Sequence, residues 1–323
     1  MKKKIVEKIL ESTDIAISSH MRPDADCIGS GIALCLMLEQ LEKNVCFRNI
    51  DSASFPLTEF PGFDKIRYKQ ISPDKFDAVI LLEGGSEDRH GQKDLNNYFT
   101  INIDHHATSS TISDLNWIDP DASAVGELIF DLGNELKINF TKEIGFNLYA
   151  AIASDTGSFK YSNTSYRALK IASEIVRRSG IEPHSVSDLI FNSNPIEKIT
   201  LTQKILSTLK FAHKGEIASI GCRINFLDSG KIDDYDTEDI ISIVRSIIGV
   251  KVVLFLKEIE KNSFRISIRS KGDFNASEIA RLYNGGGHGH AAGFFFNGAF
   301  EKANREITDI IIKTLKKDQS DKK

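Results

Sequence analysis

The 323-residue sequence contains few cysteines and no long hydrophobic run. Its four cysteines lack the paired spacing of a structural zinc site or a disulfide framework, so we expect reduced thiols. No stretch of about 18 apolar residues occurs, which argues against a membrane-spanning helix. The basic start Met1-Lys2-Lys3-Lys4 leads into an amphipathic pattern instead of the apolar core of a signal peptide. These absences predict a cytoplasmic protein without a membrane segment.

The sequence also lacks an excess of basic residues, with 41 Lys and Arg against 45 Asp and Glu, a net charge of −4. Proteins that wrap long DNA or RNA usually present a strongly basic surface, because their binding displaces counterions from many phosphates. The charge therefore argues against a long nucleic-acid partner. It favours a mononucleotide or a short oligonucleotide, which needs only a few phosphate contacts.

The densest group of metal-ligating side chains lies in His20-Met21-Arg22-Pro23-Asp24-Ala25-Asp26. Ile15-Ala16-Ile17 before it is typical of the end of a buried strand, and apolar residues recur at helical spacing from Gly31 to Leu41. We therefore expect the motif on a loop at the carboxyl end of a strand, where open α/β sheets bind ligands. Two carboxylates and an imidazole this close together are costly unless they share a cation.

Three further segments each deliver acids or histidines at the end of an apolar element. The apolar strand Ile101-Asn102-Ile103 runs into Asp104-His105-His106, the strand 78–82 ends on Glu83, and a small-residue helix at 148–153 leads to Asp155. A set rich in oxygen with a minority of imidazoles suits Mn²⁺ or Mg²⁺ and disfavours a structural zinc site. So many anionic ligands exceed the needs of one divalent ion and indicate two metals with a bridging carboxylate.

The order of elements predicts two α/β domains. Residues 1–185 alternate strand and helix patterns, which predicts a mostly parallel sheet covered by helices on both faces. Residues 186–213 are predicted to form a helical linker, and residues 214–323 a smaller mixed α/β domain. Strands are expected near residue 15 and at 45–47, 79–82, 100–103, 217–223, 252–256 and 264–269, and helices at 31–43, 124–135, 165–179 and 300–317.

Four motifs, taken in this order, resemble the DHH-family phosphoesterases whose second domain is named DHHA1. They are His20 to Ser30, Asp104-His105-His106, Asp155-Thr156-Gly157, and the glycine-rich Asn284-Gly285-Gly286-Gly287-His288 with Ala291-Ala292-Gly293. The resemblance covers nearly the whole chain and is nearest to the nanoRNase and 3′,5′-bisphosphonucleotide phosphatase branch. It implies a catalytic DHH domain and a substrate-binding DHHA1 domain, with an active-site cleft between them.

The resemblance also implies a role for each residue of the metal site. His20 and Asp24 would hold one Mn²⁺, with Mg²⁺ or Co²⁺ as alternatives, and Asp26, His105 and Asp155 would hold the second. Two further roles are implied beside the metals, with His106 contacting phosphate or donating a proton and Asp104 orienting the imidazoles. Cys27, inside the first motif, is expected to pack behind the ligands.

Glu83 departs from the family pattern, which has an aspartate after this strand. A glutamate keeps the charge that would bridge both metals but adds one methylene, so it must fold back or shift them. Gly84-Gly85 is expected to let the backbone retreat. Asp88 is a candidate substitute ligand, but its position five residues further into the loop is expected to be too far from the metals.

Residues on both domains are candidates for binding the substrate phosphates, because guanidinium groups and glycine-rich backbone bind anions. The candidates are Arg22 and Arg89 near the metals, and Arg269, Ser270, Gly285, Gly286, Gly287 and His288 in the second domain. Phe294-Phe295-Phe296 is expected to pack in the core in preference to stacking on a base.

The leading functional hypothesis is a manganese-dependent hydrolase that releases mononucleotides from very short RNA, with phosphatase action on 3′-phosphoadenosine 5′-phosphate. One alternative is a phosphodiesterase for cyclic di-AMP or its linear product pApA. A third reading, motivated by Glu83, is a non-catalytic nucleotide sensor. A homodimer remains open.

Overall fold

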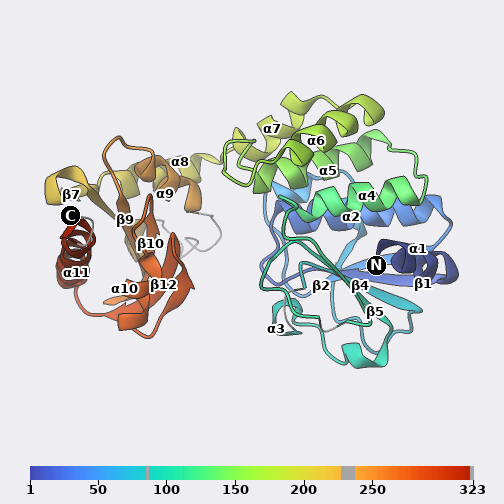
Figure 1. Ribbon diagram of the computed structural model, residues 1–323, viewed down its shortest axis with the longest axis horizontal. Helices are drawn as coiled ribbons and strands as arrows, with labels where there is room; N and C mark the ends of the chain where they lie inside the picture. The colour runs from blue at the N-terminus through green and yellow to red at the C-terminus, as the bar shows by residue number, and fades with distance from the viewer. Residues whose placement is uncertain (85–86, 112, 227–236, 321–323) are drawn as a thin grey trace. The chain divides into compact units, whose positions relative to one another are not determined.

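The computed structural model describes residues 1–84, 87–111, 113–226 and 237–320, without the side chains of residues 87, 88, 288 and 317–320. The chain divides into two compact units, Met1–Ser193 and Asn194–Lys323 (Figure 1). None of the helices in the described ranges is long and apolar enough to span a membrane. The architecture is α/β in both units, as the sequence predicted.

The first unit contains a six-stranded sheet in the order β3-β2-β1-β4-β5-β6, and all of its strand pairs are parallel. The strands are β1 (Asp14–Ser18), β2 (Asn44–Asn49), β3 (Ile66–Tyr68), β4 (Ala78–Leu82), β5 (Thr100–Asp104) and β6 (Leu115–Ile118). The α-helices are α1 (Lys2–Glu11), α2 (Ala25–Gln40), α3 (Glu87–His90), α4 (Val125–Glu135), α5 (Lys142–Asp155), α6 (Tyr166–Ser179) and α7 (Pro183–Phe191). The 3-10 turns are η1 (Leu57–Glu59), η2 (Phe63–Lys65) and η3 (Leu95–Asn97). The strand order reverses between β1 and β4, and sheets of this kind bind ligands at the carboxyl ends beside such a reversal.

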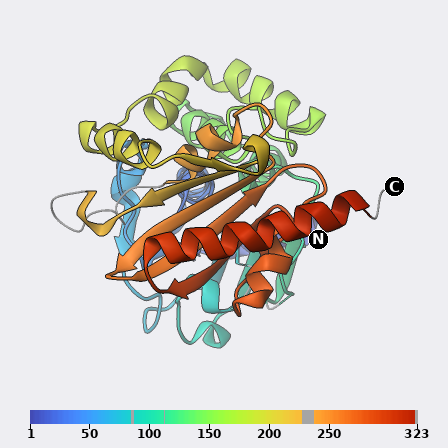
Figure 2. The ribbon, with the colours of Figure 1, turned by 90° about the vertical axis from the view of Figure 1, so that its left-hand side faces the viewer.

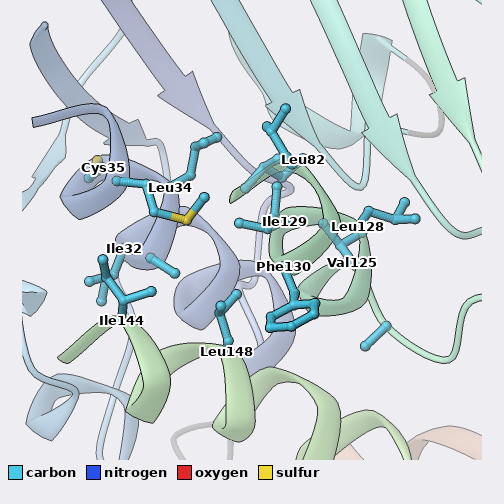
Figure 3. Packing of buried hydrophobic residues seen from close by; sticks show 14 of the residues in the cluster. Ile32, Leu34, Cys35, Leu82, Val125, Leu128, Ile129, Phe130, Ile144 and Leu148 are labelled. Carbon is cyan, nitrogen blue, oxygen red and sulfur yellow. The ribbon is translucent and has the colours of Figure 1, made fainter. Parts of the chain in front are cut away.

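The main core of the first unit lies between the sheet and its long helices. Figure 3 shows Ile32 of α2, Ile129 of α4 and Leu148 of α5 converging below Leu82 of β4. Helices α2 and α5 approach so closely that a Cβ on Gly29 would lie 2.5 Å from the carbonyl oxygen of Asn147. A side chain there would separate the two helices.

The opposite face of this sheet differs from the sequence prediction. Its buried residues Ala16, Val79 and Leu81 pack with Ile71, and the partly buried residues around them come from β2, the loops and η3. Within the described ranges, the long helices of the first unit belong to the other cluster. The expectation of helices on both faces is therefore wrong, because loop side chains are sufficient to bury this small face.

The second unit contains a mixed six-stranded sheet in the order β11-β12-β10-β9-β8-β7, in which β8 and β9 are parallel and the other pairs antiparallel. The strands are β7 (Lys210–Ala212), β8 (Ile217–Cys222), β9 (Val252–Glu260), β10 (Ser263–Ser270), β11 (Gly286–His288) and β12 (Ala291–Asn297). The helices are α8 (Ile196–Leu206), α9 (Glu238–Arg245), α10 (Ala276–Leu282) and α11 (Phe300–Ser320), with the 3-10 turns η4 (His213–Gly215) and η5 (Ile224–Phe226).

Two apolar clusters lie on the two faces of the second sheet. Helix α11 crosses one face (Figure 2), where its residues Ala303, Ile307 and Ile311 are buried together with α10. Helices α8 and α9 share the other cluster with β8 and β9. The segment predicted as a linker, 186–213, is divided between the units, since α7 contacts α5 and α8 contacts β8.

Candidate functional site

The carboxyl ends of three neighbouring strands bring most of the predicted ligands together. His20 follows β1, Glu83 follows β4 directly, and Asp104 ends β5 before His105 and His106. Because β1, β4 and β5 are adjacent parallel strands, their carboxyl ends meet at one edge of the sheet. Two helices supply the remaining acids of the site. Asp24 is the N-cap of α2, Asp26 lies in the first turn of α2, and Asp155 is the last residue of α5.

The sequence pattern predicted that the first motif lies on a loop. In the structure, the second part of the motif lies on a helix instead. Helix α2 begins at Ala25, and the Asp24 side chain caps it by accepting a hydrogen bond from the Cys27 amide at 3.0 Å. Asp26 therefore sits in the first helical turn, fully buried. The glycines at 29 and 31 weakened the helical pattern at this point, because glycine is a poor helix former.

Asp26 is held by backbone amides that lie about 100 residues away in the sequence. Its carboxylate accepts hydrogen bonds from the amides of Val125 at 2.6 Å and Gly126 at 3.0 Å, and from the Ser30 hydroxyl at 2.9 Å. The two amides belong to the first turn of α4. A helix N-terminus stabilises negative charge, so α4 fixes the orientation of this carboxylate.

His20 contacts two of the carboxylates. Its Nδ1 lies 2.7 Å from the carbonyl oxygen of Met21, so Nδ1 donates and Nε2 is left facing the acids. The Nε2 atom lies 3.6 Å from Asp24 Oδ2 and 3.5 Å from Glu83 Oε2. Together with the Cys27 sulfur, these three residues form a group whose potential ligand atoms all lie within 4.8 Å of one another. Burial raises the pKa of the Cys27 thiol to about 12, which keeps this thiol protonated.

His105 contacts the other pair of acids. Its Nε2 lies 3.5 Å from Asp155 Oδ2 and 4.0 Å from Asp26 Oδ2, and its Nδ1 lies 3.3 Å from the carbonyl oxygen of Ala122. Asp26, His105 and Asp155 form a second group of potential ligand atoms within 4.8 Å. The carbonyl contact fixes the ring so that Nε2 faces the carboxylates.

A third group connects the first two. Glu83, His105 and His106 also have potential ligand atoms within 4.8 Å of one another, so Glu83 and His105 are each shared between two groups. Asp104 lies behind His106, and its Oδ1 accepts hydrogen bonds from the His106 amide at 2.9 Å and from Nδ1 at 2.8 Å. Asp104 thereby fixes the orientation of the His106 ring and leaves Nε2 as the ring nitrogen that faces the site.

The backbone of Glu83 has an unusual conformation at this shared position. The residue is 2% exposed and has a φ of +56°, a left-handed conformation that is rare for a residue with a side chain. At the next position, a Cβ on Gly84 would lie 2.6 Å from Asn102 Oδ1 and 2.8 Å from His90 Nε2. Gly84 is thus needed for close approach. The predicted contributions of Gly85 and of the Asp88 side chain lie outside the described residues.

The buried carboxylates raise one another's pKa. Burial and the neighbouring acids raise the pKa of both Glu83 and Asp155 well above the usual range, and burial raises that of Asp26. Burial alone would lower the pKa of His20, but its contacts with Asp24, Cys27 and Glu83 raise it. The cluster therefore concentrates more negative charge than its two nearest imidazoles balance.

Several atoms of the cluster are also without a hydrogen-bond partner. Within the described ranges, His20 Nε2, His105 Nε2 and Glu83 Oε1 are buried and unpaired. Buried polar atoms without partners are costly, and close carboxylates repel. Divalent cations at these atoms would relieve both costs, so the residues present fit a metal centre rich in oxygen ligands.

Arg22 and Arg89 line a cavity beside His20. The cavity has a volume of about 420 Å³ and is also lined by Met21. The Met21 amide donates to the Arg89 carbonyl at 2.7 Å, and the Arg22 amide donates to Asp51 Oδ2 at 2.9 Å. Neither guanidinium forms an ion pair with a carboxylate whose position is described. The two cations are thus available to an anion next to the carboxylate cluster.

The glycine-rich segment of the second unit forms an edge strand. Gly286–His288 forms β11, which pairs with β12 at the edge of the sheet. Gly287 has a φ of +138°, and a Cβ there would lie 2.4 Å from the Ala291 carbonyl oxygen. Gly285 also lies against β12, since its Cβ would meet the Gly293 carbonyl at 2.3 Å. The side chain of His288 is outside the described part of the chain.

Arg269 and Ser270 make contacts within the second unit. The Arg269 guanidinium is ion-paired with Glu238 of α9. Ser270 is 3% exposed, and its hydroxyl donates to the Phe274 carbonyl at 2.8 Å. In this structure Ser270 organises the turn after β10. Arg269 would have to exchange Glu238 for a phosphate in order to bind substrate.

Two residues near the site escaped the sequence analysis. His90 is fully buried next to Gly84, and Asn102 is a fully buried amide in β5 that donates to Ser109 Oγ at 3.2 Å. The signal for Asn102 was a polar residue in the middle of an apolar strand, which is unusual unless its side chain has a specific partner. No comparable signal marked His90, because its loop carries many polar residues.

Comparison with known proteins agrees with this arrangement. Residues 14–152 match the DHH family, N-terminal domain, and residues 223–317 match the DHHA1 domain. A bifunctional oligoribonuclease and PAP phosphatase NrnA from Thermus thermophilus is 28% identical over 97% of this chain and 94% of that protein. The protein of the same name from Bacillus subtilis is also 28% identical, over 96% of this chain and 97% of that protein.

A solved structure shares the fold along nearly the whole length. The exopolyphosphatase-related protein from Bacteroides fragilis superposes with a TM-score of 0.82 at 24% sequence identity, covering 98% of this chain and 95% of that one. The two family matches together span most of the chain, in the order that the motifs predicted. The chain therefore belongs to the DHH family of phosphoesterases and combines an N-terminal DHH domain with a DHHA1 domain.

Proposed function

We propose that the protein is a Mn²⁺-dependent phosphodiesterase that hydrolyses short oligoribonucleotides to mononucleotides and also dephosphorylates 3′-phosphoadenosine 5′-phosphate. The observation that carries the proposal is the overlap of the three ligand groups through Glu83 and His105. Mixed carboxylate and imidazole ligands suit Mn²⁺ or Mg²⁺. The names of the Thermus and Bacillus relatives support the choice of substrates.

Six side chains would hold the cations. His20 and Asp24 would bind one, and three residues, Asp26, His105 and Asp155, would bind the other. Glu83 would bind both, since its carboxylate lies near His20 and belongs to the group of His105 and His106. When bound, two divalent cations supply charge neutralisation and Lewis acidity to a phosphoester.

The chain's own residues would orient the substrate around this centre. Asp104 accepts the hydrogen bond from His106 Nδ1, so Nε2 is the ring atom left to meet a phosphate oxygen or the departing oxygen. Arg22 and Arg89 line the cavity beside His20, where a guanidinium can hold a phosphate with two parallel hydrogen bonds. These contacts would place the phosphorus atom next to the carboxylate cluster.

The second unit would bind the remainder of the nucleotide. Because β11 is an edge strand, one side of its backbone has no ladder partner among the described strands and can meet an anion. Gly285, Gly286, Gly287 and His288 would contribute through this edge. Arg269 would join them by releasing Glu238, and Ser270 would shape the adjoining turn.

The proposal is tested with a panel of substrates and three variants. The purified protein with Mn²⁺ is given pApA, longer oligoribonucleotides, cyclic di-AMP and 3′-phosphoadenosine 5′-phosphate, and the products are separated chromatographically. We expect mononucleotides from pApA, a loss of most of this activity in Glu83→Gln, and retained activity in Glu83→Asp. Glu135→Gln, at the exposed end of α4, serves as the matched control.

Each contrary outcome identifies a different error. Negligible turnover in the native chain, with nucleotide binding intact and activity appearing only in Glu83→Asp, would indicate a sensor and overturn the enzymatic proposal. Hydrolysis of cyclic di-AMP in strong preference to linear substrates would overturn the proposed substrate class. Full activity in Glu83→Gln would exclude a bridging role for this carboxylate.

A further inference from the structure

Phe295 is an exposed aromatic residue in the middle of a strand. Strand β12 alternates, so Phe294 and Phe296 are 4% and 7% exposed, whereas Phe295 is 65% exposed. Phe294 stacks on Tyr283 in the core with ring centroids 4.5 Å apart. The sequence-based expectation that all three phenylalanines pack in the core is therefore wrong for Phe295, because successive side chains of a strand point to opposite faces.

The face that carries Phe295 is exposed at this residue and at its partner on β10. Residues directly opposite one another on paired strands point to the same face, and Phe295 is opposite Arg265. Arg265 is exposed and forms no ion pair with the described carboxylates. Helix α9 contacts β10, and its Glu238 pairs with Arg269. The exposure of Phe295 and Arg265 shows that the described residues leave their part of the face uncovered.

Next to this pair the face is unusually flat. Gly286 of β11 is opposite Gly293 of β12, which is opposite Ser267 of β10. Apart from Gly286 itself and its two chain neighbours, no atom of the described residues lies within 4 Å of a Cβ built on Gly286. One row of this face therefore carries no side chain larger than a hydroxymethyl group over three strands. The row next to it carries the Phe295 ring and the Arg265 guanidinium.

We propose that Phe295 and Arg265 form a platform for the substrate, on which a nucleobase stacks against the Phe295 ring while Arg265 pairs with a backbone phosphate. The proposal rests on the function proposed above and extends it to a specific base contact. A planar base and its ribose need a flat surface without large side chains, and the row of Gly286, Gly293 and Ser267 provides one. Phosphates need a cation, which Arg265 provides.

The chemistry of the face favours a nucleic acid over a protein partner. A protein-docking surface usually has several apolar side chains at its centre. This face instead presents one aromatic ring among glycines, a serine and arginines. Single-stranded nucleic acid is bound by this combination of isolated rings and cations. The predicted phosphate-binding edge, Gly285 to His288, adjoins the same strand.

The test measures stacking directly in the full-length protein. Three trinucleotides, each with 2-aminopurine at a different position, are titrated with wild type and variants in EDTA, which prevents turnover. In the wild type, stacking should quench the fluorescence of one of the three. Phe295→Leu keeps the apolar volume but lacks the ring, and it should abolish this quenching and weaken binding about tenfold. Phe295→Trp should restore both.

Two further variants and one control sharpen the result. Gly286→Val places a side chain on the open floor, and it should weaken binding as Phe295→Leu does. Arg265→Gln should lower the dependence of log K on log salt by about 0.7, the value for one phosphate contact on a single strand. The control is Phe211→Leu, since Phe211 is 53% exposed on β7 at the opposite edge of the sheet and should bind like the wild type.

The outcomes separate this inference from the proposed function. If the wild type binds and hydrolyses oligoribonucleotides but Phe295→Leu is indistinguishable from it, the platform is refuted and the enzymatic proposal stands. If the wild type neither binds nor hydrolyses any oligoribonucleotide, the proposed function fails. A change of oligomeric state in Phe295→Leu with unchanged nucleotide binding would identify a protein interface and also refute the platform.

Discussion

Acidification should destabilise the first unit through His90, which is fully buried next to Gly84. Burial lowers the pKa of His90 from its usual 6.5 to about 4, because little solvent remains to hydrate an imidazolium. Neither ring nitrogen makes a hydrogen bond of normal geometry with the described residues. The folded chain therefore keeps this ring neutral at pH values at which the unfolded chain protonates it.

The sign and the size of the effect follow from this difference in pKa. Since the folded-state pKa lies below the unfolded one, the contribution of His90 to stability is complete above about 6.5 and is lost as the pH falls towards about 4. At about 1.4 kcal/mol per pKa unit, the free energy of unfolding should fall by about 2 kcal/mol between about pH 7 and about pH 5. His90→Leu, of similar volume and without a titrating group, should lose this part of the pH dependence.

The assay is urea unfolding in EDTA, followed by the fluorescence of Trp117. This is the one tryptophan of the sequence and lies in β6, so it reports on the first unit. Wild type, His90→Leu and the control His184→Gln are compared at about pH 7 and about pH 5. The His184 side chain is 83% exposed, so the control should keep the wild-type difference. An equal loss of stability in His90→Leu and wild type would refute the reasoning.

Three further predictions address the carboxylate cluster. Mn²⁺ at about 100 times its dissociation constant should raise the free energy of unfolding reported by Trp117 by about 2.7 kcal/mol, and EDTA should reverse this increase. An unchanged free energy of unfolding in the presence of Mn²⁺ would argue against a metal centre. Asp104→Ala removes the acceptor of His106 Nδ1 and should lower kcat about 10- to 100-fold at unchanged metal content, so loss of bound metal by elemental analysis would contradict its role. Gly84→Ala brings a Cβ within 2.6 Å of Asn102 Oδ1 and should cost about 1–3 kcal/mol, which an unchanged urea midpoint would disprove.

The sequence predicted the fold class and the residue types of the site because both depend on local patterns. Apolar runs of strand length that end in acids or histidines identify the carboxyl ends of parallel strands, and β1, β4 and β5 have this form. The order of the motifs was sufficient to identify both domains, and the family matches confirm it. The roles of the individual ligands stay predictions.

Other features depended on residues far apart in the sequence. No local pattern indicates that Asp26 accepts hydrogen bonds from the amides of Val125 and Gly126, since packing of α2 against α4 creates these bonds. The extra methylene of Glu83 was visible, but its left-handed backbone was not, because sequence alone does not reveal how Asn102 and His90 surround the next residue.

The second unit shows the same division. The sequence by itself determined that 294–296 is an apolar run and that 285–287 is free of side chains. Only the tertiary structure decided that Phe295 faces away from the core, in register with Arg265, and that the glycines form a flat row beside them. The physical reason is that a strand's alternation fixes which residues share a face, whereas the packing of helices decides which face is buried.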